Sequence, residues 1–357
     1  MNPPVQWFRL GRVEYADGLE LQRQFQEARR ENLVPDTLLL LEHSPVLTLG
    51  RAAHQTNIIA PKQQLDALGV DTFETDRGGD VTYHGPGQIV GYPLLHLGPG
   101  RQDVRRYVRA IEELIIRTVA DWGITATRIE KWPGVWVEQS RRGGPRKIAA
   151  LGVHLSRWYT KHGFALNVQP ELSHFQLIVP CGIREAGVTS MREELGRELP
   201  LAEVEERLGH HFREVFECDV AAGPEPARSI SVSVRRDDGR VLLLQRTEAR
   251  GGFWQPVTGR VEAGETPQQA AVRELREETG LEVAVQPLGY EHVFAFGSPE
   301  TPQVPRLFRE TAFVARTSTA EIRLDRSEHQ AFEWVSTADA LAKVPFAGLA
   351  KALKLTA

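Results

Sequence analysis

Three glutamates in the second half of the chain have the spacing of one helix face. Glu274, Glu277 and Glu278 lie in the run GRVEAGETPQQAAVRELREETGL (259–281), at positions i, i+3 and i+4. Carboxylates this close repel one another and raise each other's pKa. A hard divalent cation with oxygen ligands, such as Mg²⁺, relieves that repulsion. Taken alone, the three charges favour a solvated acidic helix face.

A lysine and a cysteine in the first half form a second candidate for chemistry. The apolar run KIAALGVHL begins at Lys147 and is typical of a buried strand, and in IVPCGIREAGVTSM a Pro-Cys-Gly turn presents Cys181. If the two side chains meet, the ammonium charge lowers the pKa of the thiol and favours a thiolate nucleophile. A desolvated Lys147 can also exchange a proton near neutral pH. Considered singly, a lysine with its head in solvent and a small buried cysteine are the simpler interpretations.

A glycine-rich run, RGGDVTYHGPGQ (77–88), surrounds one arginine and one histidine. Glycine accepts dihedral angles that other residues resist, so the main chain can approach a ligand closely. The run matches neither GxxxxGK[ST] nor a GxGxxG between a strand and a helix, so no phosphate cradle is predicted. An isolated run of this kind favours a pair of glycine-rich turns.

Four motifs together give the first half a family resemblance. RGGDVTYHGPGQIVGYPL, KIAALGVHL, GFALNV and VPCGI occur in this order and resemble the octanoyltransferases of lipoate biosynthesis, which share the biotin/lipoate protein ligase fold. The resemblance implies that octanoate passes from acyl carrier protein to Cys181 as a thioester, without a cofactor. A lysine on a lipoyl domain, in 2-oxoacid dehydrogenase complexes or the glycine cleavage H protein, then receives it as an amide. Lys147 matches the residue that lowers the thiol pKa and relays the proton.

The same resemblance assigns an acyl-binding pocket. Its glycines are expected to let the main chain close around a slim acyl chain, and a narrow tunnel can measure chain length at roughly 0.8 kcal/mol per buried CH₂. Backbone N–H groups around Gly182 are further candidates, as donors to the tetrahedral oxyanion. The residues expected to line the pocket are Arg77, Gly78, Gly79, Asp80, Val81, Thr82, Tyr83, His84, Ala150, Leu151, Gly152, Gly163, Phe164 and Ala165.

The nearest alternative within this fold is a lipoate–protein ligase, which activates a free acid with ATP. Cys181 argues against it, because adenylation needs no protein nucleophile. A degenerate binding module is a second alternative, against which the presence of both Lys147 and Cys181 argues. The arginine-rich segment EQSRRGGPRK (138–147) is either a solvated hairpin tip or a contact for the acidic surface of acyl carrier protein, through Arg141, Arg142 and Arg146.

The glutamate run resembles the Nudix box at every fixed position, beginning at Gly259 and ending at Gly280. The resemblance implies a mixed sheet between helices and the hydrolysis of a nucleoside diphosphate linked to another group. Glu274, Glu277 and Glu278 would hold Mg²⁺ (or Mn²⁺), with the carbonyl of Gly259 as a further ligand. The metal would bridge phosphate oxygens and help to activate water. Glu265 is expected to support the loop.

The nucleotide substrate is only weakly indicated. FWQPVTG (253–259) and SEHQAFEWV (327–335) resemble the bacterial subgroup that acts on nucleoside or pterin triphosphates. Trp254 is a candidate for base stacking or for the core, and Glu328 for a metal ligand, a base or a surface ion pair. The alternative to hydrolysis is a non-catalytic nucleotide sensor that regulates the transferase, although a sensor has no need of three metal ligands.

The elements that must position these residues indicate two α+β domains. A chain of 357 residues exceeds one ordinary core, and the segment AAGPEPARS has the composition of a linker. Helices are predicted at 102–123 and 199–220, a third from the Thr266 cap to Gly280, and a hairpin turn at Asp238-Gly239. The predicted organisation is an octanoyltransferase domain at 1–220, a linker at 221–229 and a Nudix α/β/α sandwich at 230–357.

Composition narrows the functional classes. The net charge of −4 suggests neither a nucleic-acid nor a membrane surface as partner. Two cysteines cannot form a disulfide framework and fit a reducing compartment. Neither a membrane span nor a signal peptide is apparent, so the expected location is the cytoplasm.

Overall fold

The chain folds into two compact units whose main division lies between Pro224 and Glu225. The computed structural model describes residues 4–130, 132–179, 187–297, 301 and 303–356. Within these ranges, no helix is both long enough and apolar enough to cross a membrane. The predicted linker at 221–229 is shorter in the structure. Its first residues belong to strand β12 (Val220–Ala222) and its last to β13 (Ala227–Arg236), because both ends form backbone hydrogen bonds within sheets.

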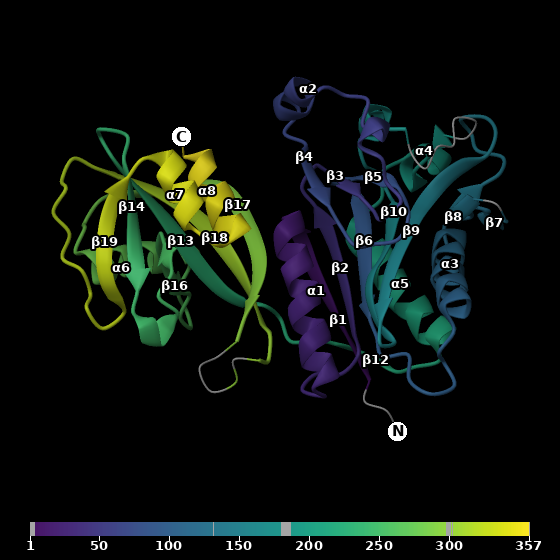
Figure 1. Cartoon of the computed structure of the whole chain (residues 1–357), viewed down its shortest axis with the longest axis horizontal. Helices are drawn as coiled ribbons and strands as arrows, with labels where there is room; N and C mark the ends of the chain where they lie inside the picture. Colours follow the sequence, from purple (N-terminus) through teal and green to yellow (C-terminus); the bar gives the residue numbers. More distant parts are fainter. Residues whose placement is uncertain (1–3, 131, 180–186, 298–300, 302, 357) are drawn as a thin grey trace. The chain divides into compact units, whose positions relative to one another are not determined.

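A nine-stranded sheet forms the centre of the N-terminal unit, in the order β12-β1-β2-β6-β10-β9-β8-β7, with β11 on β9 (Figure 1). Its mixed parallel and antiparallel pairs agree with the predicted α+β class. A three-stranded sheet, β4-β3-β5, carries the glycine-rich run. The remaining strands of this unit are β1 (Val5–Val13), β2 (Thr37–His43), β3 (Val46–Leu49), β4 (Asp71–Glu74), β5 (Val81–His84), β6 (Gln88–Leu94), β7 (Thr127–Ile129), β8 (Trp132–Val137), β9 (Arg146–Ser156), β10 (Tyr159–Asn167) and β11 (Gly187–Val188).

Two long helices, α3 and α5, pack on the large sheet and build the main core. They lie within the helices predicted at 102–123 and 199–220, and Ile111 of α3 and Phe212 of α5 are fully buried against sheet residues such as Leu40 and Leu166. At roughly 2 kcal/mol for each large apolar side chain, this face is a main source of stability. The helices of the unit are α1 (Tyr15–Arg30), α2 (Lys62–Ala67), α3 (Val104–Ala120), α4 (Met191–Leu195) and α5 (Leu201–Phe216), with 3-10 turns at Gln55–Asn57 and Leu172–Leu177.

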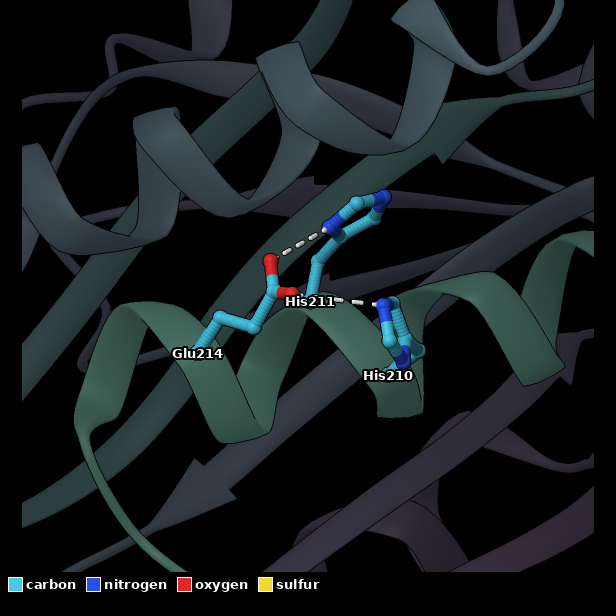
Figure 2. A group of neighbouring side chains, drawn as sticks. All are labelled: His210, His211 and Glu214. Atoms are coloured by element: carbon cyan, nitrogen blue, oxygen red, sulfur yellow. Dashed lines mark hydrogen bonds and ion pairs between the residues drawn. The ribbon is translucent and has the colours of Figure 1, made fainter.

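A polar cluster joins α3 and α5 at the edge of this core. Nε2 of His211, on α5, lies 2.9 Å from the carboxylate of Asp121, the residue after α3. Nδ1 of the same ring lies 3.2 Å from the carboxylate of Glu214. Figure 2 shows Glu214 between His211 and the neighbouring His210. Burial opposes ionisation of Asp121, but hydrogen bonds from Arg207 and His211 outweigh it and keep the pKa of Asp121 low. Because both nitrogens of His211 already have carboxylate partners, the cluster is an ion-pair network between two helices.

Replacing His211 by alanine is expected to loosen the contact between these helices. The ring is only 10% exposed, so its loss removes a hydrogen bond to a charged group and leaves a gap. We expect the free energy of unfolding to fall by about 1–2 kcal/mol, read as faster hydrogen exchange of the α5 amides. A His210→Ala variant is the control, because that side chain is 50% exposed and its ion pair contributes little. Equal losses in both variants would contradict the assignment.

The C-terminal unit is a mixed sheet between helices, as the Nudix resemblance implies. The sheet has the order β15-β14-β13-β18-β17, with β16 on β13 and β19 on β14. Strands β13 and β18 are parallel, and β13 turns into β14 at Gly239, which confirms the predicted hairpin. The strands not yet given are β14 (Val241–Arg246), β15 (Trp254–Gln255), β16 (Val257–Arg260), β17 (Val285–Phe296), β18 (Arg306–Thr317) and β19 (His329–Val335).

Alternation along β13 and β14 divides the core of this unit into two layers. Ile230 and Leu244 face helix α6 (Pro267–Thr279), whereas Val241 and Leu243 face α7 (Thr337–Lys343) and α8 (Ala347–Leu355). Successive side chains on a strand point to opposite faces, so a strand with apolar residues throughout must be covered on both sides.

Helix α6 has the ends that its sequence predicts. Thr266 accepts from the backbone N–H of Gln269, whose side chain caps in return, and Pro267 occupies the first turn. Gly280 ends the helix in the left-handed conformation, with φ of 72°. These local signals fix where the helix begins and ends, and therefore which face its glutamates occupy.

Candidate active sites

A cavity of about 370 Å³ in the N-terminal unit gathers most of the pocket residues predicted from the sequence. It lies between the glycine-rich run and strands β6, β9 and β10, which pair in adjacent positions. Gly78 and Tyr83 do not line it; Tyr83 is buried instead against Phe175. The predicted residues that do line the cavity are Arg77, Gly79, Asp80, Val81, Thr82, His84, Lys147, Ala150, Leu151, Gly152, Gly163, Phe164 and Ala165.

The glycines at this cavity chiefly permit main chain to pack on main chain. Gly78 N–H donates to the carbonyl of Val153 at 3.0 Å, which ties the glycine-rich run to β9. A Cβ on Gly152 would lie 2.8 Å from the carbonyl oxygen of Gly78, and one on Gly163 would lie 2.1 Å from that of Gly91. A side chain at either position would therefore push apart the segments that form the cavity wall.

Arg77 and His84 are buried parts of this wall. Arg77 donates to the carbonyl of Thr48 at 2.6 Å and to its hydroxyl, which fixes the run against β3. The His84 ring stacks on Tyr15, with centroids 6.1 Å apart, and its Nδ1 lies 2.7 Å from Gln88 Oε1. Burial lowers the pKa of His84 to about 3, so the imidazole is neutral at pH 7.

Lys147 lies at one end of the same cavity. In the sheet, Lys147 of β9 is paired with Trp136 of β8 and with Val188 of β11. Its Nζ lies 4.9 Å from the centre of the Trp136 ring. A cation over an indole face is attracted by the negative face of the ring. The predicted partner, Cys181, and its neighbour Gly182 lie outside the described residues, so the lysine–cysteine pair stays a prediction.

An aspartate and a histidine that the sequence reasoning did not select also meet here. His162 lines the cavity, and its Nε2 lies 2.6 Å from Oδ1 of Asp76. Asp76 also contacts His154 and Lys161, at 2.6 and 3.1 Å. Asp76 directly precedes RGGDVTYHGPGQ and His162 directly precedes GFALNV. This position next to a motif is the only indication that the sequence gives of their role.

The arginines proposed to meet acyl carrier protein are partly engaged with α4. Arg141 donates to the carbonyl of Glu194 at 3.3 Å, and Arg142 lies 3.7 Å from the carboxylate of Glu193. Arg146 donates to backbone carbonyls within its own loop. A second cavity, of about 570 Å³, is lined by Arg142 and Arg146 together with Arg192. Glu171 and Glu193 also line this cavity, so the loop is an arginine-rich rim beside a cavity of mixed charge.

In the C-terminal unit, the three box glutamates have different surroundings. Their side chains are 16%, 50% and 3% exposed for Glu274, Glu277 and Glu278. Arg273 lies between them and Glu265, with contacts of 2.8 to 3.0 Å to Glu274, Glu277 and Glu265. Glu265 thus supports the loop through Arg273, in agreement with the expected role.

Gly259 holds the carboxylate of Glu274 against the backbone of β16. A Cβ at this position would lie 1.9 Å from Cδ of Glu274, so only glycine leaves room for that side chain. Burial raises the pKa of Glu274 to about 7. Glu274 and the main chain at Gly259 are therefore adjacent, as their predicted roles at one metal require.

Glu278 is the deepest of the three, and its carboxylate lacks good partners. Neither oxygen has a hydrogen-bond partner among the described residues, but His329 Nε2 lies within ion-pair distance, 3.1 Å from Oε1. Burial raises the pKa of Glu278. Ligand atoms of Glu278, Glu328 and His329 all lie within 4.8 Å of one another.

The buried carboxylate of Glu278 fits a divalent cation. A buried carboxylate without hydrogen bonds is costly unless a positive charge reaches it, and carboxylate oxygens are the ligands that Mg²⁺ and Mn²⁺ accept. Glu328 is also held by Arg246 at 2.8 Å and Arg250 at 3.0 Å, so both the ion-pair and the ligand interpretations apply to it. Trp254 packs beside Lys343, whose Nζ lies 4.7 Å from its ring centre.

Comparisons with known proteins agree with both halves. Residues 14–213 match the lipoyl protein ligase A/B catalytic domain, and residues 225–354 match the NUDIX domain. A Myxococcus xanthus octanoyltransferase is 56% identical over 351 residues, 97% of each chain. A Solibacter usitatus octanoyltransferase is 53% identical over 215 residues, which cover 60% of this chain and 94% of the other. The Escherichia coli dihydroneopterin triphosphate pyrophosphohydrolase structure covers 37% of this chain and 96% of its own, at 28% identity and a TM-score of 0.33.

The cavity with its lysine and the catalytic-domain match define the class: the chain belongs to the lipoyl protein ligase A/B family. Within that family it belongs with the octanoyltransferases, and a Nudix domain follows the transferase domain in the same chain.

Proposed function

We propose that the protein transfers an octanoyl group from acyl carrier protein to a lysine of a lipoyl domain, through a thioester on Cys181. The observation that carries this proposal is the position of Lys147, which lines a cavity bounded by Leu151 and Phe164 in a chain of the octanoyltransferase family. An apolar cavity of this size suits a medium acyl chain. We place the reaction in the cytoplasm, and the acceptors in 2-oxoacid dehydrogenase complexes and the glycine cleavage H protein.

The chemistry balances without a cofactor. The Cys181 thiolate attacks the carbonyl carbon of the donor thioester, and the carrier's thiol leaves with a proton. The amine of the acceptor lysine then attacks the enzyme thioester, the C–S bond breaks, and an octanoyl amide forms. The Lys147 ammonium can give the proton to the leaving carrier thiol in the first half-reaction. The neutral Lys147 amine can then take up the proton that the acceptor lysine loses in the second.

Intact-mass spectrometry of the protein after incubation with octanoyl acyl carrier protein tests this mechanism. We expect an adduct of one octanoyl group, which disappears when a lipoyl domain is added. The same experiment with octanoate and ATP distinguishes the lipoate–protein ligase alternative. An adduct that forms only with ATP, or transfer without any adduct on position 181, would contradict the proposal.

Charge reversal on the arginine-rich rim tests the carrier-protein contact. Arg142 and Arg146 line the second cavity, so an Arg142→Glu, Arg146→Glu variant is expected to raise the KM for octanoyl acyl carrier protein about tenfold or more. Transfer from a small octanoyl thioester should change little. Arg105→Glu, an exposed position on α3, is the control. Equal losses with both donors would show that the loop acts through structure rather than through recognition.

For the C-terminal domain we propose metal-dependent hydrolysis of a nucleoside or pterin triphosphate. The buried, unsatisfied carboxylate of Glu278 supports an active site over a sensor, because binding alone does not need a carboxylate held in that state. Glu274, Glu277, Glu278 and the Gly259 carbonyl would hold the ion, which supplies charge stabilisation to the phosphates when bound. Release of pyrophosphate from a panel of triphosphates with Mg²⁺ or Mn²⁺ tests this. Tight nucleotide binding without release would favour the sensor.

A further inference from the structure

The acyl cavity has two different ends, and the strand register separates them. Lys147 stands at one end, on β9, where it pairs with Val188. His162 stands at the other end, on β10, opposite Val153. Val153 follows Lys147 by six positions on the same strand, which at about 3.3 Å per residue amounts to roughly 20 Å. An extended eight-carbon chain needs on the order of 10 Å. The side chains of Lys147 and His162 and the thioester group occupy the rest of this distance.

His162 is held in place by contacts of both its backbone and its ring. Its backbone has a φ of 59°, a left-handed conformation that is uncommon outside glycine. Its N–H donates to Oε1 of Gln22 at 2.7 Å, and its ring is bound to Asp76 at 2.6 Å. The side chain is only 2% exposed, and its ring lies 6.3 Å from that of Tyr92, which also lines the cavity. A strained backbone kept by three contacts indicates a role for the position of this ring.

The ring is suited to meet an apolar chain end. Burial lowers the pKa of His162 to about 4, against the opposing effect of Asp76, so the imidazole is uncharged at pH 7. Burial also opposes the ionisation of Asp76, but hydrogen bonds from His162 and Lys161 outweigh it and keep the pKa of that carboxyl low. The carboxylate therefore stays charged behind a neutral ring.

The residues on the far side of the His162 ring from the cavity are partly exposed to solvent. The Asp76 side chain is 38% exposed, and its other partners, His154 and Lys161, are 20% and 21% exposed. Beside the ring, Gly163 and Gly152 face each other across β10 and β9 and contribute no side chain. The imidazole thus lies between the cavity that it lines and the partly exposed Asp76.

We propose that His162, fixed by Asp76, is the stop that sets the length of acyl chain the transferase accepts. The inference rests on the proposed function, with the reacting thioester at the Lys147 end. A chain of eight carbons ends before the ring, whereas a longer chain meets it. Asp76 acts as a positioning residue for the stop. Gly152 and Gly163, which have no side chains, leave space for the acyl chain as far as the His162 ring.

The test compares octanoyl, decanoyl and dodecanoyl thioesters in the wild-type protein and a His162→Gly variant. Glycine suits the left-handed backbone, so the substitution removes the ring without adding strain. We expect the ratio of kcat/KM for dodecanoyl over octanoyl to rise at least about tenfold, because four further CH₂ groups gain a path out of the cavity. Transfer of octanoyl is expected to fall as well, because the ring lines the cavity, so the ratio of the two substrates is the readout. An Asp76→Asn variant, which loosens the ring, should shift the ratio in the same direction by less.

Arg157→Gly is the matched control. Arg157 also has a left-handed backbone, with φ of 52°, but is exposed and does not line the cavity. A shift of the ratio in this control equal to that in His162→Gly would overturn the inference, since backbone relief alone would explain it. A dodecanoyl-to-octanoyl ratio of kcat/KM that stays at the wild-type value in both His162→Gly and Asp76→Asn would also overturn the inference. If His162→Gly does not fold, the ratio in Asp76→Asn decides alone. Failure of wild type to transfer octanoyl would instead overturn the proposed function, and this inference with it.

Discussion

Replacing Lys147 by alanine is expected to lower octanoyl transfer by roughly 10²- to 10⁴-fold, the usual contribution of a positioned acid–base group. The loss should appear in kcat more than in KM, because Lys147 lies at one end of the cavity and most of the acyl contacts lie elsewhere. The side chain packs over Trp136 at 4.9 Å, so its removal also leaves a small gap, which a Lys147→Met variant fills. We expect both variants to be similarly inactive.

The measurement is the rate of octanoyl transfer to a lipoyl domain, with adduct formation followed separately by intact mass. Cys181→Ala should form no adduct at all. Cys218→Ala is the control, because burial raises the pKa of that thiol to about 11 and leaves it a poor nucleophile. If Lys147→Met kept a wild-type rate, the lysine would have no part in proton transfer. If Cys181→Ala still transferred octanoyl, the covalent mechanism would be wrong.

Glu278→Gln is expected to abolish metal-dependent hydrolysis in the C-terminal domain, by about 10²-fold or more, and to weaken metal binding. Glutamine keeps the shape of the side chain but offers a neutral, poorer ligand. Without metal, the same change should stabilise the domain, because it removes a carboxylate that is 3% exposed and forms no hydrogen bond with a described residue. The variant should therefore melt at a higher temperature than wild type without metal, and gain less when Mn²⁺ is added.

Manganese binding by electron paramagnetic resonance and thermal unfolding with and without the ion provide readouts independent of activity. Glu282→Gln is the matched control, since Glu282 follows the same helix but is exposed. Wild-type metal affinity in Glu278→Gln would exclude Glu278 as a ligand. Octanoyl transfer by this variant should be unchanged, and a loss there would favour the sensor over a separate hydrolase.

The sequence by itself determined the features that depend on neighbouring residues. The start and end of α6 follow from Thr266, Gln269 and Gly280, which lie next to the backbone groups that they cap or bend. The hairpin at Gly239 is local in the same sense, because only that residue type adopts its φ of 83° without cost. Helical spacing of apolar residues likewise placed α3. Motifs in family order indicated the two domains before any contact was known.

Only the tertiary structure decided which of these residues meet. Asp76 and His162 are separated by 86 positions, and Glu278 and His329 by 51, so no local pattern joins them. Each pair forms where strands or helices from distant parts of the chain pack together. The same packing buries one box glutamate and exposes another, and it changes the pKa of His84 through desolvation. Spacing determines which face of an element a residue occupies, but burial and partners depend on what that face contacts.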